Sequence, residues 1–442
     1  MKNISTENIC INTIRFLSID MVQKANSGHP GAPMSLAPAA FTLWKDHLNF
    51  NPNDPEWINR DRFILSAGHA SALLYSMLHL TGYKLSIEDL KQFRQYGSIT
   101  PGHPEVGLTP GVEATTGPLG QGFANGVGMA IASKKMSQSM ANKDALTHKI
   151  YSIVSDGDLM EGISSEAASL AGTLGLGNLI YLYDSNDISI EGSTNLAFTE
   201  NVAERFKSYG WDVSEDINGE DTQKISKAIE NAKIETKKPS LIILKTKIGF
   251  GSPNKVGKET AHGEALGVKE VKLTRDELGW NYDPFEIPEE VLSYFKSLTK
   301  KKINIYMDWV ERNSTRDDNK PNLINILPSI NIKLMELYEK SLIKEYSSRD
   351  ASGIILNKIA ENTQLLIGGS ADLAGSTKTF IKNSPSISSS NFSGINIHFG
   401  VREHSMGAII NGIALYSNYL PYAGTFLVFS DYMRSSIRLS AL

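Results

Sequence analysis

Two runs decide the fold: KIYSIVSDGD at 149–158 and NLIYLYDSN at 178–186. Each is apolar over several consecutive positions and ends in acidic or amide side chains. A small-residue, glycine-ended helix at 161–177 separates them, and a third apolar run at 239–247 follows a helix around 221–236. Continuous apolar strands that alternate with helices are typical of a parallel sheet covered by helices on both faces. The sequence therefore predicts an α/β protein.

Polar side chains follow the first two strands. Asp156 and Gly157 come after one strand, and Asn186 follows the next. In a parallel sheet both ends lie at the carboxyl edge, where ligands bind. Carboxylate and amide oxygens suit Mg²⁺ or Ca²⁺, which often bridge to phosphate. Gly157 allows a phosphate close to the backbone, and the next helix can present its N-terminus to that anion. An ordinary strand-to-helix turn is the competing interpretation of this short motif.

The spacing between these residues is a further feature of the motif: Asn186 stands thirty positions after Asp156. This resembles the thiamine-diphosphate signature, in which Gly-Asp-Gly is followed some thirty residues later by a pair of asparagines. Two positions depart from that pattern. Ser155 stands at the first glycine, and Ser185 stands at the first asparagine.

The composition limits the classes of protein to consider. The chain has 442 residues and is 41% hydrophobic, which is enough for two or more domains. Its 44 Lys and Arg against 48 Asp and Glu do not indicate a nucleic-acid partner. Cys10 is the only cysteine, which excludes an intrachain disulfide and a cysteine-based metal site. With no membrane-length apolar run and no leader pattern, we expect a cytoplasmic protein without a membrane partner.

A second α/β unit is expected after a polar, helical connector at 274–325. Its predicted elements are a helix at 331–345, a strand at 363–372 and a helix at 402–417. With about three strands it is short for a complete domain. The chain is thus expected to hold two α/β units.

Several loops rich in glycine and proline each carry a histidine. These are His29, His69 and His103, and His262 lies in a similar glycine-containing segment. A single loop histidine is usually a turn or surface residue. Four such loops are an unusual use of a rare residue.

Many segments, in order, resemble the transketolase family. They are KANSGHPGAPMSLAPAA (24–40), LSAGHASALLYSMLHLTGY (65–83), PGHPE (101–105), TTGPLGQG (115–122), EGISSEAASLAG (161–172), KVGKETAHGEALG (255–267), GSADLAGS (369–376), HFGVREHSMGAI (398–409) and GTFLVFSDY (424–432). The resemblance runs from about residue 10 to residue 442 and is weakest at 280–330. Several matched segments in one order are more specific than a single motif.

The resemblance implies a thiamine-diphosphate-binding fold with parallel sheets and two such domains. A diphosphate- and metal-binding domain is expected at 1–280, a connector at 281–330 and an incomplete pyrimidine-binding domain at 331–442. The family's third domain is expected to be absent from this chain.

The resemblance also implies the cofactor residues. The metal, Mg²⁺ or alternatively Ca²⁺ or Mn²⁺, would be held by Asp156, Asn186 and the carbonyl of Ile188. Thiamine diphosphate would contact His69, Gly117, Pro118, Leu119, Gly157, Asn186, His262, Asp372, Glu403, Phe426, Phe429 and Tyr432. In this arrangement Glu403 shares a proton with a ring nitrogen of the pyrimidine, and the aromatic side chains enclose that ring.

The same resemblance implies which residues take part in catalysis and which bind the substrate. Glu403, His29 and His262 would be catalytic. The sugar phosphates would be bound by His29, His103, His262, Arg349 and Ser376. Arg349 suits a phosphate because its guanidinium is a planar fork of donors.

The function implied is transfer of a two-carbon ketol unit from a ketose phosphate to an aldose phosphate, as in the pentose phosphate pathway, through a carbanion of thiamine diphosphate. A homodimer with active sites at the subunit interface is expected. Two alternatives stay open: a dihydroxyacetone synthase that uses formaldehyde as acceptor, and a truncated, non-catalytic product that keeps the cofactor motifs. Deoxyxylulose-phosphate synthase is a more distant rival, against which the loops of His29, His103 and His262 argue.

Overall fold

The computed structural model describes residues 5–140, 145–313, 335, 345–416 and 418–442. They divide into two compact units. Unit 1 consists of the described residues of Met1–Phe123, His148–Gly162 and Gly177–Arg312; unit 2 consists of those of Ala124–Thr147, Ile163–Leu176 and Asn313–Leu442. The predicted helix at 331–345 falls almost entirely outside the described residues.

Unit 1 is built on a five-stranded sheet in the order β1-β2-β3-β7-β6, in which every neighbouring pair is parallel. Its strands are β1 (Arg62–Leu65), β2 (Ile150–Ser155), β3 (Leu179–Ser185), β6 (Asp212–Asn218) and β7 (Ser240–Lys245). The predicted α/β class is confirmed. The three strands expected from continuous apolar runs are β2, β3 and β7, which occupy the centre of the sheet.

Successive residues of a strand point to opposite sides of the sheet, so a strand that is apolar throughout must be covered on both faces. Helices provide this cover. On one face, Tyr151, Ile153 and Ile180 join a core with the first three helices and α9. On the other face, Tyr181 packs edge to face on Phe123 at a ring distance of 4.7 Å and lies beside Trp211. This two-sided burial explains why the central strands are apolar at consecutive positions.

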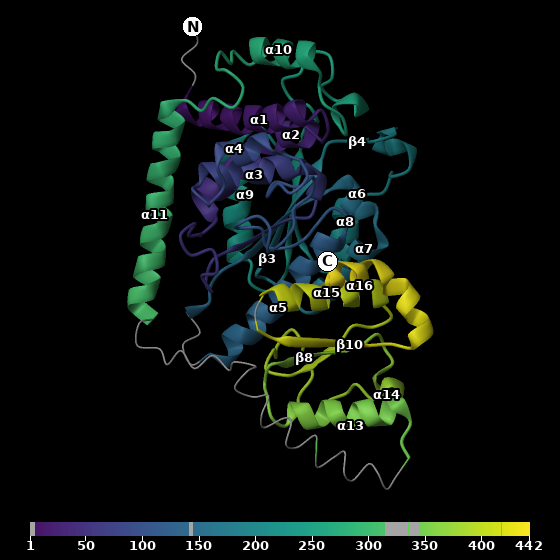
Figure 1. Cartoon of the computed structure of the whole chain (residues 1–442). Coiled ribbons are helices and arrows are strands. Elements are labelled where there is room, and N and C mark those ends of the chain that lie inside the picture. Colours follow the sequence, from purple (N-terminus) through teal and green to yellow (C-terminus); the bar gives the residue numbers. More distant parts are fainter. Residues whose placement is uncertain (1–4, 141–144, 314–334, 336–344, 417) are drawn as a thin grey trace. The chain divides into compact units, whose positions relative to one another are not determined.

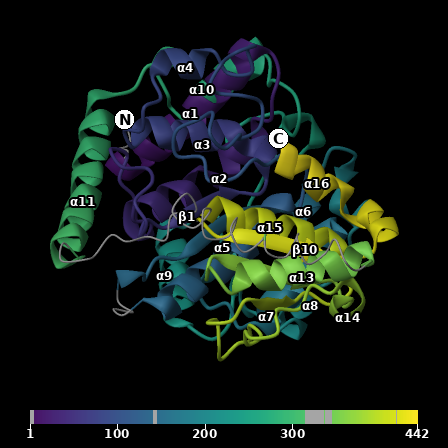
Figure 2. The same ribbon diagram turned by 60° about the horizontal axis from the view of Figure 1, so that its bottom comes forward.

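In unit 1, the helices α1, α2, α3 and α4 lie together on one side, and the green α11 runs along an edge of the unit (Figures 1 and 2). Their bounds are α1 (Thr6–Ala25), α2 (Gly31–Thr42), α3 (Ser71–Leu80), α4 (Ile87–Lys91), α6 (Asp156–Met160), α8 (Val202–Ser208), α9 (Thr222–Ile234), α10 (Val268–Glu277) and α11 (Glu289–Asn313). Shorter elements are the π-helix η1 (Leu43–His47), the 3₁₀ turns η2 (Gly68–Ala70), η4 (Thr194–Leu196) and η5 (Glu259–Ala261), and the hairpin strands β4 (Ile188–Ser189) and β5 (Gly192–Ser193).

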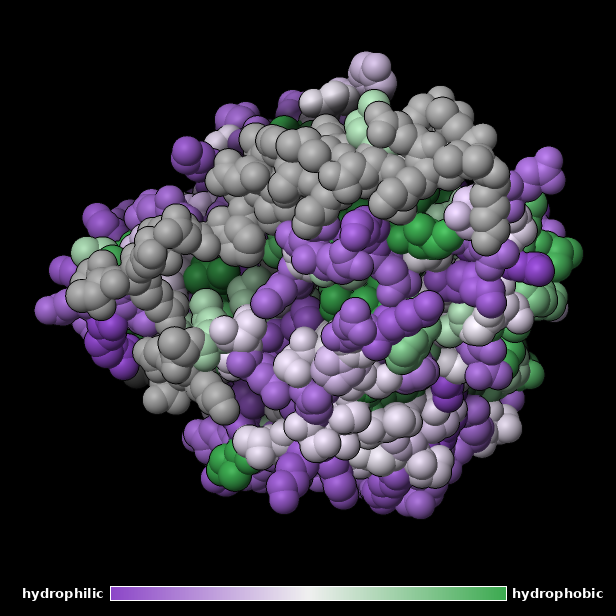
Figure 3. All heavy atoms as spheres, turned by 90° about the horizontal axis from the view of Figure 1, so that it is seen from below, coloured by the Kyte–Doolittle hydropathy of each residue, from purple (hydrophilic) through white to green (hydrophobic). Residues whose placement is uncertain are grey.

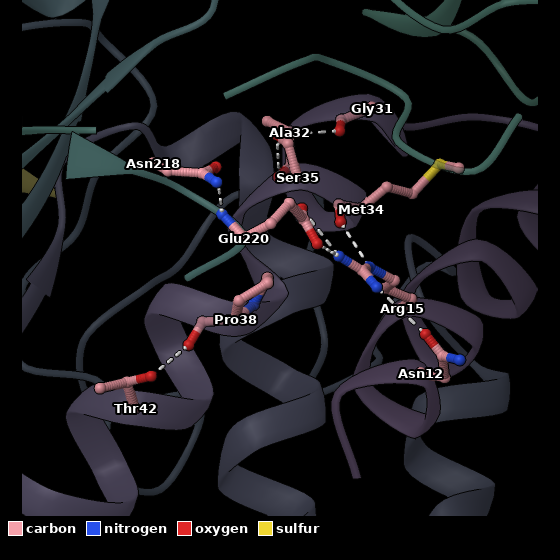
Figure 4. A network of polar contacts seen from close by, with 10 residues as sticks. All are labelled: Asn12, Arg15, Gly31, Ala32, Met34, Ser35, Pro38, Thr42, Asn218 and Glu220. Atoms are coloured by element: carbon pink, nitrogen blue, oxygen red, sulfur yellow. Dashed lines mark hydrogen bonds and ion pairs between the residues drawn. The ribbon is translucent and has the colours of Figure 1, made fainter. Parts of the chain in front are cut away.

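α1 is buried at every position from Cys10 to Val22, including its charged residues. Arg15 satisfies its guanidinium with the carbonyl of Met34 at 2.8 Å and both carboxylate oxygens of Glu220 at 2.7 and 2.9 Å (Figure 4). It also stacks 4.2 Å from the ring centre of Phe250. A buried charge of this kind is tolerated only when it is paired and hydrogen-bonded. Arg15 therefore ties α1 to α2 and to the loops after β6 and β7.

Unit 2 has a three-stranded parallel sheet in the order β10-β8-β9. Its strands are β8 (Leu366–Ser370), β9 (Asn396–His398) and β10 (Leu420–Gly424), and its helical elements are α7 (Gly162–Thr173), α13 (Ser348–Ala360), α14 (Ala374–Thr377), α15 (Glu403–Tyr416), η6 (Leu427–Met433), α16 (Arg434–Ala441) and most of α5 (Gln121–Ser139). In Figure 1, α13 and α15 lie on opposite sides of this sheet. The expected second α/β unit is thus present.

On the face seen in Figure 3, outside the grey atoms, hydrophilic residues predominate and apolar residues form separate small patches. Among the described residues, no helix combines the length and apolar character that crossing a membrane requires.

Candidate active site

The carboxyl end of β2 turns directly into α6, and Ser155 makes this turn. Its hydroxyl accepts a hydrogen bond from the Asp158 N–H at 3.4 Å, while Asp158 accepts one from the Ser155 N–H at 2.9 Å. This reciprocal arrangement is a capping box. Ser155 has φ −113°, which any residue can adopt. Its departure from the expected glycine is therefore compatible with the turn.

Asp158 connects this turn to two other loops. Its carboxylate also accepts hydrogen bonds from the Ser66 hydroxyl at 2.7 Å and the Gly120 N–H at 2.8 Å. The side chain is fully buried. We assigned no role to Asp158 from the sequence. The signal that could have revealed it is the Ser-x-x-Asp spacing at the end of a strand.

Asp156 lies beside Asp158 but faces a different neighbour. Tyr183 donates a short hydrogen bond to its Oδ1, whereas Oδ2 is buried and has no partner among the described residues. Burial raises the pKa of Asp156 to about 7; the hydrogen bond from Tyr183 opposes this shift, and the charges of Asp184 and Asp187 add to it. A carboxylate oxygen left unsatisfied in such a place is costly unless a cation or donor binds it.

Asn186 follows β3 in a turn that fixes its amide. Its Nδ2 donates to Asp184 at 2.9 Å, and its Oδ1 accepts from the Ile188 N–H at 3.0 Å. Asp184 is itself held by Thr246, and burial raises its pKa to about 6. Asp187, with φ 63°, turns the chain so that Ile188 starts the short hairpin of β4 and β5.

These residues fit a divalent cation that also contacts a phosphate. Within the described residues, no group of three or more His, Cys, Asp and Glu side chains is arranged to hold a metal. A cation here would combine one carboxylate, from Asp156, with amide and carbonyl oxygens from Asn186 and Ile188. Such oxygen ligands suit Mg²⁺, which usually takes one or two carboxylates plus phosphate oxygens.

Glycines bring the neighbouring loops close together. A Cβ at Gly68 would lie 2.6 Å from the Gly117 nitrogen, and one at Gly117, where φ is 131°, would lie 3.0 Å from Cγ of His103. A Cβ at Gly157 would lie 2.8 Å from Cδ1 of Leu119. At Gly68 the neighbour is backbone, so only glycine permits that approach, whereas at Gly157 the neighbour is the end of the Leu119 side chain. The loop of Gly117, Pro118 and Leu119 therefore lies between His103 and the Asp156 turn.

The four loop histidines cluster in unit 1. The ring centres of His29 and His69 are 5.2 Å apart, those of His69 and His262 are 5.2 Å apart, and that of His29 lies 5.6 Å from His262 and 6.3 Å from His103. The Nδ1 atoms of His29 and His262 are buried and have no hydrogen-bond partner in the described part of the chain. These two ring nitrogens are thus unsatisfied polar atoms within the cluster.

The cluster keeps its imidazoles neutral. Burial, with the nearby His262, Arg94 and His103, lowers the pKa of His29 to about 4. Burial lowers the pKa of His69 well below its usual value, and it also lowers the pKa of His262 and of His103, the last with help from Arg94. Near pH 7 each ring can therefore offer one donor and one acceptor.

The other predicted residues lie in unit 2. Glu403 is buried and is the first residue of α15, whose Ser405 N–H donates to Glu166 of α7 at 2.9 Å. The rings of Phe426 and Phe429 stack at 5.6 Å, and Tyr432 lies 6.1 Å from Phe429.

Asp372, Arg349 and Ser376 are exposed residues of unit 2. Asp372 has φ 60° at the end of β8 and lines a cavity of about 400 Å³ together with Ser370 and Arg402. Arg349 lies in the first turn of α13, and Ser376 lies in α14.

Comparison with protein families gives two matches. Residues 6–330 match the family model described as transketolase, thiamine diphosphate binding domain, and residues 344–442 match transketolase, pyrimidine binding domain.

Individual relatives agree with these families. Transketolase of Geobacillus stearothermophilus is 50% identical over 449 residues, which cover 99% of this chain and 67% of that protein. Transketolase 2 of Escherichia coli is 50% identical over 444 residues, covering 98% and 66%. A crystal structure of Pichia stipitis transketolase with sedoheptulose 7-phosphate superposes with a TM-score of 0.91 at 44% identity, covering 99% of this chain and 67% of that one. The Campylobacter jejuni transketolase structure gives a TM-score of 0.90 at 45% identity, covering 99% and 68%.

Proposed function

The chain belongs to the transketolase family, and from this membership we propose that the protein transfers a two-carbon ketol unit from a ketose phosphate to an aldose phosphate. One observation carries the proposal: His29, His69, His103 and His262 form a neutral cluster in the unit whose sheet edge presents Asp156 and Asn186. Such a combination suits an enzyme that orients sugar hydroxyls beside a metal-bound diphosphate.

The cofactor proposed is thiamine diphosphate with Mg²⁺, and Ca²⁺ or Mn²⁺ are possible substitutes. Asp156, Asn186 and the Ile188 carbonyl would hold the metal. The diphosphate would be contacted by His69, Gly117, Pro118, Leu119, Gly157, Asn186 and His262. When bound, thiamine diphosphate supplies the nucleophilic carbon that accepts and releases the two-carbon unit. The unpartnered Oδ2 of Asp156 supports this assignment.

The protein's own residues would orient the sugars and move protons. His29 and His262 are neutral, so each imidazole has one donor and one acceptor nitrogen and can exchange a proton with a sugar hydroxyl or carbonyl oxygen. His103 would bind a hydroxyl further along the substrate. Arg349 and Ser376 would bind its phosphate, and their exposure would let an anion reach them from solvent.

Unit 2 would supply the pyrimidine site. Asp372, Glu403, Phe426, Phe429 and Tyr432 would surround the ring, and Glu403 would share a proton with its nitrogen. We propose a homodimer with active sites at the subunit interface. In support, Phe426 and Tyr432 are exposed on unit 2, as are Leu427 and Val428 beside them. Exposed aromatic and aliphatic side chains in one segment are typical of a surface that another chain covers.

The remaining assignments follow from the family. We propose the domain limits 1–280 and 331–442 with a connector at 281–330. A cytoplasmic location and a role in the pentose phosphate pathway are also proposed. The single cysteine, Cys10, is free and buried, which is compatible with a reducing compartment.

Product analysis tests the proposed activity. Fructose 6-phosphate and a five-carbon aldose phosphate are incubated with the protein, thiamine diphosphate and Mg²⁺, and the products are identified by mass spectrometry. We expect a seven-carbon ketose phosphate and a four-carbon aldose phosphate in equal amounts. If a protein that binds both cofactors forms neither product, the proposed function is wrong. Efficient transfer of the two-carbon unit from the ketose phosphate to formaldehyde, which forms dihydroxyacetone, would instead favour the dihydroxyacetone synthase alternative.

A further inference from the structure

The loop between β7 and α10 carries His262, and it contains little regular structure. Between Lys245 and Val268 only η5 (Glu259–Ala261) is helical. The loop nevertheless packs tightly against the first turn of α2, because a Cβ at Gly31 would lie 2.4 Å from the carbonyl oxygen of Ala261. A loop whose backbone must lie this close to another backbone needs anchors of its own.

Glu270, in the first turn of α10, is such an anchor. Its Oε1 accepts hydrogen bonds from the Ser252 hydroxyl at 2.5 Å and the Asn254 N–H at 2.8 Å, and its Oε2 accepts one from Asn254 Nδ2 at 2.9 Å. The residue is only 8% exposed. Burial alone would raise the pKa of Glu270, but these hydrogen bonds outweigh it and lower the pKa. The carboxylate therefore stays ionised and accepts all three donors.

The bonding pattern is unusual for a glutamate at this position of a helix. A carboxylate in the first turn commonly accepts the N–H of the residue that caps its own helix. Here that residue is Gly267, and its N–H donates instead to Oε1 of Gln23 at 2.8 Å. Every side-chain hydrogen bond that the structure gives Glu270 goes to the loop. Its role is thus to hold the loop rather than to begin α10.

Hydrogen bonds continue from this anchor to His262. Lys258 donates its Nζ to the carbonyl of Asn254 at 2.8 Å. The Ala261 N–H then donates to the carbonyl of Lys258 at 3.1 Å, and the His262 N–H donates to the carbonyl of Glu259 at 2.8 Å. Displacement of Asn254 would therefore shift the turn that ends at His262.

The ring of His262 has no comparable support of its own. Its Nδ1 is without a hydrogen-bond partner among the described residues, and its contacts in the cluster are with the rings of His29 and His69. Its position is consequently set by the backbone that carries it. The contacts that hold this loop, the Glu270 anchor among them, therefore affect the geometry of the histidine cluster.

We propose that Glu270 is a positioning residue for His262, because its carboxylate fixes the Ser252–Asn254 segment and so places the imidazole against His29 and His69. The inference rests on the proposed role of His262 in cofactor and substrate binding. Glu270 itself touches neither the cluster nor, by the proposed assignment, the cofactor.

The first test measures the reactivity of His262 toward diethyl pyrocarbonate in the intact chain, by peptide mass spectrometry at pH 7. In Glu270→Ala we expect modification of His262 to accelerate about fivefold or more, because local opening of the loop exposes the ring. Glu277→Ala, an exposed carboxylate at the other end of α10, is the matched control and should leave the rate unchanged. His398, an exposed histidine of unit 2, is the internal reference. An unchanged rate at His262 in folded Glu270→Ala would overturn the proposal.

A second pair of variants covers the case in which Glu270→Ala does not fold. Glu270→Gln keeps one acceptor oxygen but brings a second amide against Asn254, so we expect an intermediate rate at His262. The double variant Glu270→Gln with Asn254→Asp interchanges carboxylate and amide and restores a donor opposite an acceptor. We expect its rate to return toward that of the wild type. A double variant that reacts no more slowly than Glu270→Gln would count against the anchor.

Thiamine diphosphate binding, measured calorimetrically with Mg²⁺ on the same samples, separates this proposal from the function on which it rests. We expect Glu270→Ala to weaken binding about tenfold, as is typical when a supporting residue is removed, and Glu277→Ala to leave it unchanged. If the wild type binds no thiamine diphosphate, the proposed function fails while the reactivity of His262 still tests the anchor. If Glu270→Ala binds as tightly as the wild type, the positioning role is wrong.

Discussion

At the scale of single residues, one buried carboxylate organises the loops around the proposed cofactor site. Asp158 accepts hydrogen bonds from the Ser155 turn, from Ser66 and from Gly120. Ser66 lies three residues before His69, and Gly120 follows the Gly117–Leu119 loop directly. The same side chain thus connects the histidine loops to the turn that carries Asp156.

Replacing Asp158 by Asn tests this connection. The asparagine amide keeps only one of the two acceptor oxygens of Asp158 and replaces the other with an N–H₂ group. This group would face hydrogen-bond donors, so some of the buried donors from Ser66, Gly120 and Ser155 would lose their acceptor. We expect the free energy of unfolding to fall by about 2–4 kcal/mol. Urea unfolding measures the effect, with Asp276→Asn, an exposed carboxylate of α10, as control. Equal stability of the two variants would contradict the role given to Asp158.

The histidine cluster predicts a dependence of stability on pH. His29 has a pKa of about 4 in the folded protein, below the usual value of 6.5, so the unfolded chain binds more protons in this range. Its contribution to stability is complete above about pH 6.5 and is lost as the pH falls toward 4. We expect this loss to be on the order of 1–3 kcal/mol.

Urea unfolding of wild type and His29→Asn between pH 7.5 and pH 4.5 checks this expectation. Asparagine cannot take up the proton, so stability should fall less steeply with acid in the variant. His398→Asn, at an exposed histidine of unit 2, is the control for loss of a histidine elsewhere in the chain. Identical slopes in all three proteins would show that His29 is not held neutral.

At the scale of elements, the packing of α5 against α15 in unit 2 depends on two glycines. A Cβ at Gly128 would lie 2.0 Å from the carbonyl oxygen of Ile409, and one at Gly412 would lie 2.0 Å from that of Asn125. The Asn125 amide also donates to the carbonyl of Ala408 at 2.8 Å. The two helices therefore touch backbone to backbone, and α15 is the helix that begins with Glu403.

Gly412→Ala should separate these helices. The added methyl cannot be accommodated without a backbone shift, and we expect a loss of about 3 kcal/mol. Gly375→Ala in α14 is a suitable control, because nothing lies within 4 Å of its added Cβ. The melting temperatures of the two variants give the comparison. If Gly412→Ala melts no lower than Gly375→Ala, the helices are not in backbone contact.

Elements differ in how well the sequence predicts them. Because β2, β3 and β7 are buried on both faces, their apolar runs were sufficient to identify them. We did not predict β1, which is only four residues long, or β6, an edge strand with the polar sequence DVSEDIN. Edge strands need not be apolar, so β6 is recognised only by its pairing with β7, which follows it after α9.

The same distinction applies to the site. The loops of His29, His69, His103 and His262 could be singled out by composition, but their convergence depends on contacts between distant segments. Asp158 and Glu270 were not identified, because a carboxylate that accepts loop hydrogen bonds looks like any helix-start acid in the sequence. The roles assigned to the residues of unit 2, including Glu403 and Asp372, stay predictions.

At the scale of the whole molecule, each unit offers a different part of the proposed site. Unit 1 presents oxygen ligands and neutral imidazoles, which suit a metal-bound diphosphate. Unit 2 presents a buried glutamate and a row of aromatic side chains, which suit a heterocycle. The family relationship predicts that one cofactor uses both kinds of surface, and a dimer would bring them together.

The most direct test of the proposed cofactor site is a calorimetric titration of the folded protein with thiamine diphosphate, with and without Mg²⁺. We predict saturable binding that requires the metal and that weakens at least about tenfold in Asp156→Ala, because that variant lacks the carboxylate ligand. Binding that is equally tight without Mg²⁺ or in Asp156→Ala, or no binding by the folded wild type, would contradict the site.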